Sequence, residues 1–288
     1  MSFHFYADDT QVYKLLKPSE VDSGIKQIEN CISHTKTWMC QNKLKLNDSK
    51  TEFMVIGKPS VLKDINKPSL TLNDAVINPT QQLRNLGIIF DENLTLSSHV
   101  ASVCQTMFAV IRNVNFNRKY LTDEVATQLM VSLVLSKMDY CNSLLAGIPQ
   151  FLINKLQRVQ NCAAKVCLRK KKRDHATPLL QRLHWLPVRE RINYKIAVMV
   201  FKYFQGTTPS YISSLLQPPP KHQHQTRLSQ DKTFLNKRTT KTSSFGGKSF
   251  QYNGPLVWNS LPREIRELRD EDRFKKALKT YMFSKTYL

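Results

Sequence analysis

The sequence has few of the residues that mark specialised classes of protein. Its 288 residues include only 8 Gly and 13 Pro, which excludes a fibrous or low-complexity chain. Its 6 cysteines follow neither a disulfide framework nor a zinc-ligand spacing. The longest apolar run, near residues 196–201, is far too short to span a bilayer. We therefore expect a globular chain with reduced thiols, without a membrane segment and without zinc.

The opening residues also lack the features of a secretory signal. The stretch MSFHFYADDT has no basic start and contains two aspartates within its first nine residues. We expect an intracellular protein, nuclear or cytoplasmic, that is not secreted.

Acidic residues are scarce outside the first third of the chain. Residues 1–100 carry 11 basic and 11 acidic side chains, residues 101–200 carry 16 and 5, and residues 201–288 carry 16 and 6. The net charge of +21 therefore arises entirely in the last two thirds. Such a surface favours a polyanionic partner, either nucleic acid or an anionic membrane surface.

Hydrophobic periodicity divides the chain into a mixed first part and a helical second part. Short β-forming runs predict strands at 3–6, 10–13, 52–57, 70–72, 75–77 and 83–90. A helix is expected from Ser19 to about Trp38. After residue 94 the helical period dominates, with one stripe over 103–114 and later helices opening at Thr122, Pro149 and Pro187. The helix that opens at Thr122 is expected to reach Leu145. The pattern predicts an α+β fold.

The last quarter of the chain changes in composition. Residues 217–244 are rich in proline, glutamine, lysine and threonine, which predicts an exposed linker. Order is expected to resume at Phe245 and to end in a basic helix around residues 274–283.

Two adjacent carboxylates, Asp8 and Asp9, lie between two β-forming runs, so a tight hairpin turn is expected there. Neighbouring side chains of a continuous strand point to opposite faces, whereas a turn brings both carboxylates near one site. Oxygen ligands suit Mg²⁺, and two such ions about 3.5–4 Å apart activate a primer hydroxyl and stabilise a leaving pyrophosphate. The alternative is that aspartates simply favour turns.

The context of these aspartates resembles a known family. Phe5-Tyr6-Ala7-Asp8-Asp9-Thr10 resembles the catalytic Tyr/Phe-Ala-Asp-Asp hairpin of reverse transcriptases. Segments resembling the non-LTR (LINE-type) retrotransposon enzymes follow in the same order, at 38–52, 86–99, 139–143, 183–192, 245–247, 258–262 and 274–276. The resemblance covers nearly the whole chain. It implies an incomplete palm β-sheet with a primer-grip region over 1–92, a helical thumb-like region over 93–216, a flexible linker over 217–244 and a basic aromatic tail over 245–288.

The resemblance also implies roles for single residues. Asp8 would be a Mg²⁺ ligand and Asp9 its supporting acid. Lys50 occupies the position of a lysine proposed to protonate pyrophosphate in related polymerases, or it is a solvated lysine before a strand. Leu86 and Gly87 would place backbone against the primer terminus, or Gly87 is an ordinary turn glycine.

The chain departs from the family at its start. Reverse transcriptases need a further aspartate on an upstream palm strand, and fingers that hold the template, but only seven residues precede Asp8. We therefore expect a truncated RNA-directed DNA polymerase of a transposable element, inactive alone, whose partners are an RNA template and a DNA primer. The alternative is a non-enzymatic nucleic-acid-binding remnant that uses the basic helical region. The oligomeric state is left open.

Two basic segments are candidate nucleic-acid contacts. Arg169-Lys170-Lys171-Lys172-Arg173 closes the helix that is predicted to open at Pro149. This run is either a solvated turn favoured by the helix dipole, or a phosphate-contacting patch or nuclear-import signal. Lys241 and Lys248 lie where cations alternate with aromatics, which suits single-stranded RNA or DNA, unless those aromatics pack on the helical region.

Overall fold

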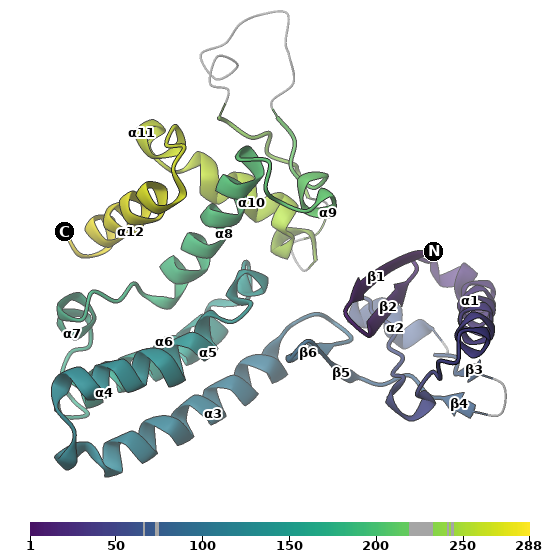
Figure 1. Cartoon of the computed structure of the whole chain (residues 1–288), viewed down its shortest axis with the longest axis horizontal. Coiled ribbons are helices and arrows are strands. Elements are labelled where there is room, and N and C mark those ends of the chain that lie inside the picture. Colours follow the sequence, from purple (N-terminus) through teal and green to yellow (C-terminus); the bar gives the residue numbers. More distant parts are fainter. Residues whose placement is uncertain (66, 73–74, 219–232, 241, 243–244) are drawn as a thin grey trace, which may run out of the picture. The chain divides into compact units, whose positions relative to one another are not determined.

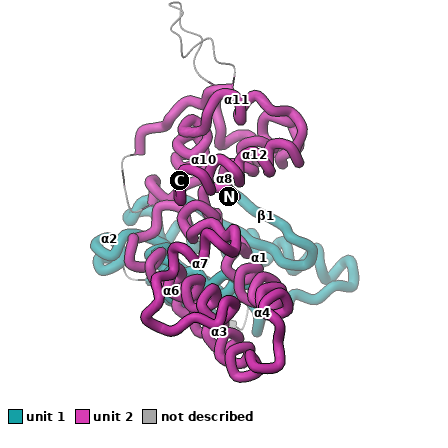
Figure 2. The backbone as a smooth tube through the Cα atoms, turned by 90° about the vertical axis from the view of Figure 1, so that its left-hand side faces the viewer, with its two compact units in different colours: residues 1–98 teal, residues 99–288 magenta. Residues whose placement is uncertain are grey.

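The computed structural model describes residues 1–288 except 66, 73–74, 219–232, 241 and 243–244 (Figure 1). The chain divides into two compact units, Met1–Ser98 and His99–Leu288 (Figure 2). The first unit combines short antiparallel strands with helices, and the described part of the second is helical. In this broad sense the predicted α+β class is confirmed. No helix among the described residues has both the length and the apolar composition needed to cross a bilayer.

The strands of the first unit form three antiparallel hairpins. The pairs are β1 (Ser2–Tyr6) with β2 (Asp9–Tyr13), β3 (Leu70–Leu72) with β4 (Ala75–Ile77), and β5 (Gln82–Asn85) with β6 (Ile88–Asp91). Each pair is a separate two-stranded sheet, so the described strands do not join into the single palm-like sheet that was expected. A hairpin needs only local pairing, whereas one continuous sheet needs long-range ladders between strands that here have three to five residues.

The strand predicted over 52–57 is wrong. Phe53 makes one isolated parallel bridge with Pro79, and no other residue of that run is in a strand. Pro79 has no N–H group to extend a ladder, and the Gly57 N–H donates instead to the Glu92 carbonyl at 2.9 Å. The apolar run over 83–90 is a hairpin rather than one strand, because Leu86 and Gly87 form its turn.

The first unit has four helical segments and few buried apolar side chains among its described residues. They are η1 (Pro18–Glu20), α1 (Val21–Gln41), η2 (Asp48–Lys50) and α2 (Pro59–Asp64), and α1 confirms the predicted helix. The Glu29 carboxylate on α1 accepts a hydrogen bond from the Thr71 N–H at 2.6 Å, which ties α1 to β3. The buried apolar side chains of this unit are Ile25, Leu62, Leu70, Leu72, Ile88 and Leu96.

A buried carboxylate orders the turn between β6 and α3 (Ser97–Phe116). Asp91, 9% exposed, accepts hydrogen bonds from the N–H groups of Asn93, Thr95 and Leu96 and from the Thr95 hydroxyl. Leu94 and Leu96 both adopt positive φ in this turn. Asp91 belongs to a segment that resembles the primer-grip region, and in this structure its carboxylate supports the turn.

The first half of the helical unit is built around α4 and α6, which lie side by side (Figure 1). Its elements after α3 are η3 (Arg118–Tyr120), α4 (Asp123–Met130), the π-helical turn η4 (Val131–Leu135), α5 (Ser136–Asp139), η5 (Asn142–Leu145) and α6 (Gln150–Cys167). Thr122 caps α4 and Pro149 precedes α6, as predicted. The prediction of one helix from Thr122 to Leu145 is wrong, because a π-helical turn interrupts it and Cys141, at φ 51°, ends it.

The second half packs α10 and α12 against α8, as Figure 1 shows. Its elements are α7 (Thr177–Arg182), α8 (Val188–Phe204), α9 (Ser210–Ser213), η6 (Gly246–Lys248), α10 (Phe250–Asn259), α11 (Arg263–Arg266) and α12 (Glu271–Tyr287). Phe201 of α8 stacks on Phe274 of α12 with ring centroids 4.2 Å apart, and Trp258 of α10 is fully buried beside them. Helix α12 confirms the basic helix predicted near the end of the chain.

The described residues of the expected linker include core residues. Leu235 is fully buried, and its N–H and carbonyl both bond to the Asn259 side chain at 3.0 and 2.8 Å. The Thr233 carbonyl accepts from Trp258 Nε1 at 2.6 Å. The prediction of an exposed linker is therefore wrong at 233–235, because one apolar side chain fills the core beside α10. The rest of the prediction over 219–232 lies outside the described residues.

Candidate functional site

The β1–β2 hairpin places Asp8 and Asp9 at a reversal of the chain, as predicted. Tyr6 pairs with Asp9, so Ala7 and Asp8 form a two-residue loop. Ala7 has φ 52°, a region in which hairpin turns usually place glycine, asparagine or aspartate. Both aspartates are exposed. The hairpin thus presents two neighbouring carboxylates to solvent from a strained turn.

The β5–β6 hairpin presents Leu86 and Gly87 in a similar turn. Both residues have positive φ, at 46° and 82°, the pattern of a type I′ loop. Gln11 of β2 donates through Nε2 to Asn85 Oδ1 at 3.1 Å. The residue next to Leu86 is therefore bonded to the strand that carries Asp9, so the structure brings the two predicted motifs into neighbouring hairpins.

Lys50 lies at the end of η2 and is exposed. Within the described residues, no hydrogen bond or ion pair joins it to Asp8 or Asp9. The strand expected after it is absent, and the role that the resemblance implies for Lys50 stays a prediction.

The donor set at Asp8 and Asp9 provides part of a metal site. Mg²⁺ takes one or two protein carboxylates when substrate phosphates and water complete its shell. A two-metal centre needs a bridging carboxylate beyond this pair. The part of the chain that the structure describes contains no group of three or more His, Cys, Asp or Glu side chains placed to hold a metal. The residues present do not fit a two-metal centre by themselves.

The basic run forms an exposed loop after α6. Arg169 adopts φ 52°, its Nε lies 3.5 Å from Asp123 Oδ1, and its Nη2 donates to the Leu121 carbonyl at 2.9 Å. The next four cations, Lys170, Lys171, Lys172 and Arg173, are exposed. The loop therefore presents four cations to solvent while the fifth is anchored.

A buried arginine, which the sequence analysis missed, holds this loop in place. Arg118 is 6% exposed and donates to the carbonyls of Val166, Leu121 and Cys167 at 2.8, 2.6 and 2.7 Å. It also bonds to Asp123 Oδ1. The guanidinium thus caps the last carbonyls of α6, where the helix dipole favours a cation. Hydrogen bonding to Arg118 lowers the pKa of Asp123 below its ordinary value, and Arg169 adds to the effect. In sequence, only an isolated Arg-Lys pair marks this position.

Of the other predicted nucleic-acid contacts, the structure describes Lys248, which lies just before α10. Lys248 ends η6, is half-buried and has interaction partners. Lys241 lies outside the described residues. Of the aromatics near them, Trp258 is fully buried and Phe250 packs against the same core. These two rings serve the core, which is the alternative that the sequence left open.

An ion pair joins two segments that are far apart in sequence, residues 139–143 and residues 183–192. Arg191 of α8 donates through Nε to Asp139 Oδ1 at 2.8 Å and through Nη2 to Oδ2, a bidentate contact. Asn142 of η5, 3% exposed, donates through Nδ2 to the same Asp139 Oδ1 at 3.2 Å. Lys195 and Lys279 join these residues in lining a pocket of about 270 Å³. Asp139 and Arg191 both lie in segments that resemble the retrotransposon enzymes, but nothing in the sequence predicted that the two side chains would pair.

Two amide side chains of α6 hold the start of α8 against α6. Gln160 is fully buried and donates to the Leu186 carbonyl at 2.9 Å. Gln157 Oε1 accepts from the Val188 N–H at 2.9 Å, and Gln157 donates to Gln160 Oε1 at 3.0 Å. The pocket walls on α8 are therefore fixed by hydrogen bonds to a rigid helix.

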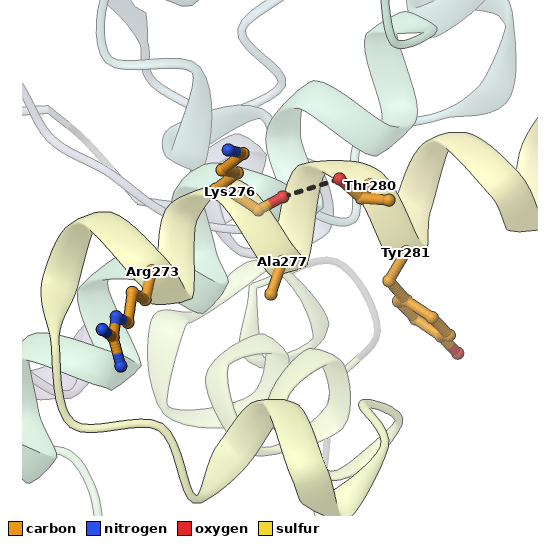
Figure 3. A pocket seen from close by; sticks show the side chains of 5 residues that line it. All are labelled: Arg273, Lys276, Ala277, Thr280 and Tyr281. Atoms are coloured by element: carbon orange, nitrogen blue, oxygen red, sulfur yellow. Dashed lines mark hydrogen bonds between the residues drawn. The ribbon is translucent and has the colours of Figure 1, made fainter.

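A shallower hollow of about 470 Å³ lies along α12 (Figure 3). Its lining residues are Arg273, Ala277 and Tyr281 on one side of α12, and Lys276 and Thr280 on the other side of the helix. The Thr280 hydroxyl is satisfied by the Lys276 carbonyl at 3.0 Å. The hollow is an exposed helix face with cations and one aromatic ring.

No protein-family model, no curated protein and no solved structure matches the chain.

Proposed function

We propose that the chain is part of an RNA-directed DNA polymerase of the non-LTR retrotransposon type. The observation that carries this is a side-chain hydrogen bond that joins two hairpins. One presents Asp8 and Asp9 at its turn, the other presents Leu86 and Gly87, and the Gln11–Asn85 hydrogen bond joins them. A polymerase needs a carboxylate pair and a turn of exposed backbone on connected elements to bring a metal to a primer terminus.

On this proposal the first unit contributes the part of the palm that contains the Asp8–Asp9 hairpin and the Leu86–Gly87 turn. The Asp8 and Asp9 carboxylates would hold Mg²⁺ together with a third acid from a further palm segment. The ion would supply charge neutralisation for the departing pyrophosphate. The turn at Leu86 and Gly87 would position the primer by backbone contact. Because two exposed carboxylates make an incomplete site, the chain by itself is not expected to polymerise.

The second unit, thumb-like on this proposal, would hold the nucleic-acid backbone. Residues 99–288 carry 32 basic and 11 acidic side chains, which accounts for the whole net charge. The loop at 170–173 presents four exposed cations next to one another. Phosphate contacts of this kind give binding that is strong, insensitive to sequence and dependent on salt.

Primer extension by complementation tests the catalytic part. The purified chain with Mg²⁺, an RNA template and a DNA primer should give no product. Adding a separately expressed fingers-and-upper-palm segment of a non-LTR reverse transcriptase should restore extension. The restored activity should be lost in Asp8→Ala and kept in Asp22→Ala, which removes an exposed acid from α1. Extension by the chain alone, or equal activity of both variants, would contradict the proposal.

Salt-dependent binding tests the second part. Replacing Lys170, Lys171, Lys172 and Arg173 by Ala should reduce the slope of log Kd against log salt for single-stranded RNA by up to about 3, at about 0.7 per phosphate contact. A charge-matched control replaces four scattered exposed cations, namely Arg112, Lys119, Lys137 and Lys285. If both quadruple variants change the slope equally, only the net charge matters and the loop is not a binding site.

A further inference from the structure

The pocket between η5, α8 and α12 has features that the polymerase proposal does not use. Asn142 lies on its η5 side, Arg191, Tyr194 and Lys195 on its α8 side, and Lys279 on α12. The three cations face a single acid, Asp139, among the residues that line it. The pocket therefore has a net positive lining.

The Asp139–Arg191 pair leaves donor capacity in the pocket. A guanidinium has five N–H groups, and the described contacts of Arg191 use Nε and Nη2 on Asp139. Lys195 and Lys279 are exposed at the rim, each with an ammonium that can reach a phosphate. An anionic group is thus favoured at the mouth of the pocket.

The Asn142 side chain supplies an unused acceptor. Its Oδ1 is buried and accepts no hydrogen bond from any described residue. A buried polar atom without a partner costs about 1–3 kcal/mol. Among the described residues, Nδ2 is bonded to Asp139 alone, at 3.2 Å, which is long for such a contact. A small rotation of the amide would turn Oδ1 toward a donor in the pocket.

Size and lining limit the group that supplies this donor. Leu186 and the half-buried Tyr194 ring form an apolar wall. A volume of about 270 Å³ is below the usual range for drug-sized ligands, so the pocket suits one flat group rather than several. A nucleobase has a flat face for an aromatic wall, an edge with N–H donors, and a phosphate attached through its sugar.

We propose that this pocket binds one unstacked base of a single-stranded nucleic acid, with its edge on Asn142 and its flanking phosphates on Lys195 and Lys279. The proposal rests on nucleic-acid binding by the second unit. It assigns to the Asp139–Arg191 pair the role of positioning Asn142. The pocket thereby adds a base-dependent contact to binding that otherwise depends only on backbone charge.

The test compares a cytosine homopolymer with an abasic strand of equal length, by fluorescence anisotropy over a range of salt. The wild-type chain should bind the cytosine strand about fivefold more tightly, the ratio given by one ordinary hydrogen bond. Asn142→Leu should remove this preference and leave abasic binding unchanged. Lys279→Ala should weaken cytosine-strand binding about threefold more than Lys276→Ala, which removes an equal charge three residues away, outside the pocket.

Each other outcome overturns the pocket assignment. Equal, salt-dependent binding of both strands leaves the backbone-binding function intact but shows that the pocket holds no base. Binding of neither strand removes both proposals. A base preference that survives in Asn142→Leu places the base elsewhere. If that variant does not fold, equal effects of Lys279→Ala and Lys276→Ala are decisive against the pocket. Tighter binding of a poly-aspartate peptide than of either strand would assign it to an acidic protein segment.

Discussion

Replacing Arg118 should unfold the helical unit more readily than any exposed substitution. Its guanidinium makes four hydrogen bonds, three to the carbonyls of Leu121, Val166 and Cys167 and one to Asp123. Val166 and Cys167 end α6, Leu121 lies just before α4, and Asp123 is the first residue of α4. Removing the side chain leaves the last turn of α6 without its cap and Asp123 without its main partner.

The magnitude follows from the burial of the side chain. Removing one partner of a buried ion pair typically costs about 3–5 kcal/mol. Arg118 is 6% exposed, but Asp123 is half-exposed and keeps Arg169, so we expect about 3–4 kcal/mol for Arg118→Leu. Arg118→Lys keeps the charge but cannot reach acceptors on both sides with one ammonium, so about 2 kcal/mol is expected. Total stabilities are about 5–15 kcal/mol, so either loss is large.

Urea unfolding followed by tryptophan fluorescence measures this loss. Trp38 lies in the first unit, so a Trp38→Phe background leaves only Trp185 and Trp258, both buried in the second unit, as reporters. The midpoint should fall without a change in m-value. Arg112→Leu, an exposed change on α3, the helix that precedes η3, should cost less than about 0.5 kcal/mol. If Arg118→Leu costs no more than Arg112→Leu, the cap does not exist in solution.

The pH dependence gives a second readout of the same contact. The pKa of Asp123 is lowered in the folded chain, chiefly by its hydrogen bond from Arg118. Its stabilising contribution is therefore complete above the ordinary aspartate pKa, near 3.8, and is lost as the pH falls through the lowered value. Stability should decline less steeply with acid in Arg118→Leu than in the parent. An identical acid profile would show that Arg118 does not stabilise the Asp123 carboxylate.

Two further predictions concern the first hairpin and the end of α12. Ala7→Gly removes the strain of a positive φ at alanine and should stabilise the β1–β2 hairpin by about 0.5–1 kcal/mol, after the entropy cost of glycine is subtracted. Amide hydrogen exchange in β2 should become slower. Unchanged or faster exchange would contradict the turn geometry. Burial raises the pKa of Tyr287 from 10.0 to about 12, so its contribution is complete below 10.0 and is lost as the pH rises toward 12. Tyr287→Phe loses the hydrogen bond to the Trp185 carbonyl and should cost about 1 kcal/mol of unfolding free energy at neutral pH. The variant should also lose less stability than the parent as the pH rises toward 12. Tyr120→Phe, at an exposed tyrosine, should change neither the stability at neutral pH nor its alkaline decline.

Local features of the fold were predictable because they depend on neighbours in sequence. The turn at Ala7 and Asp8, helix α1 and the openings of α4, α6 and α8 follow from turn formers, caps and prolines. The predictions that were wrong depended on distant partners. In the described structure, residues 52–57 pair with no strand beyond the single bridge between Phe53 and Pro79. Helix α10 was not predicted, because Gly254 and Pro255 usually mark a loop, yet tertiary packing keeps both inside a helix.

The sequence by itself determined the acidic hairpin turn, the separation of charge between the two parts of the chain and the order of most helices. Each of these follows from residue type and spacing over a few turns of chain. Only the tertiary structure decided that Gln11 meets Asn85, that Arg118 caps α6, and that Asp139 and Arg191 share one pocket. Such pairs lie about 50 or more residues apart. Their contact is fixed by how whole helices and hairpins pack, which local periodicity does not encode.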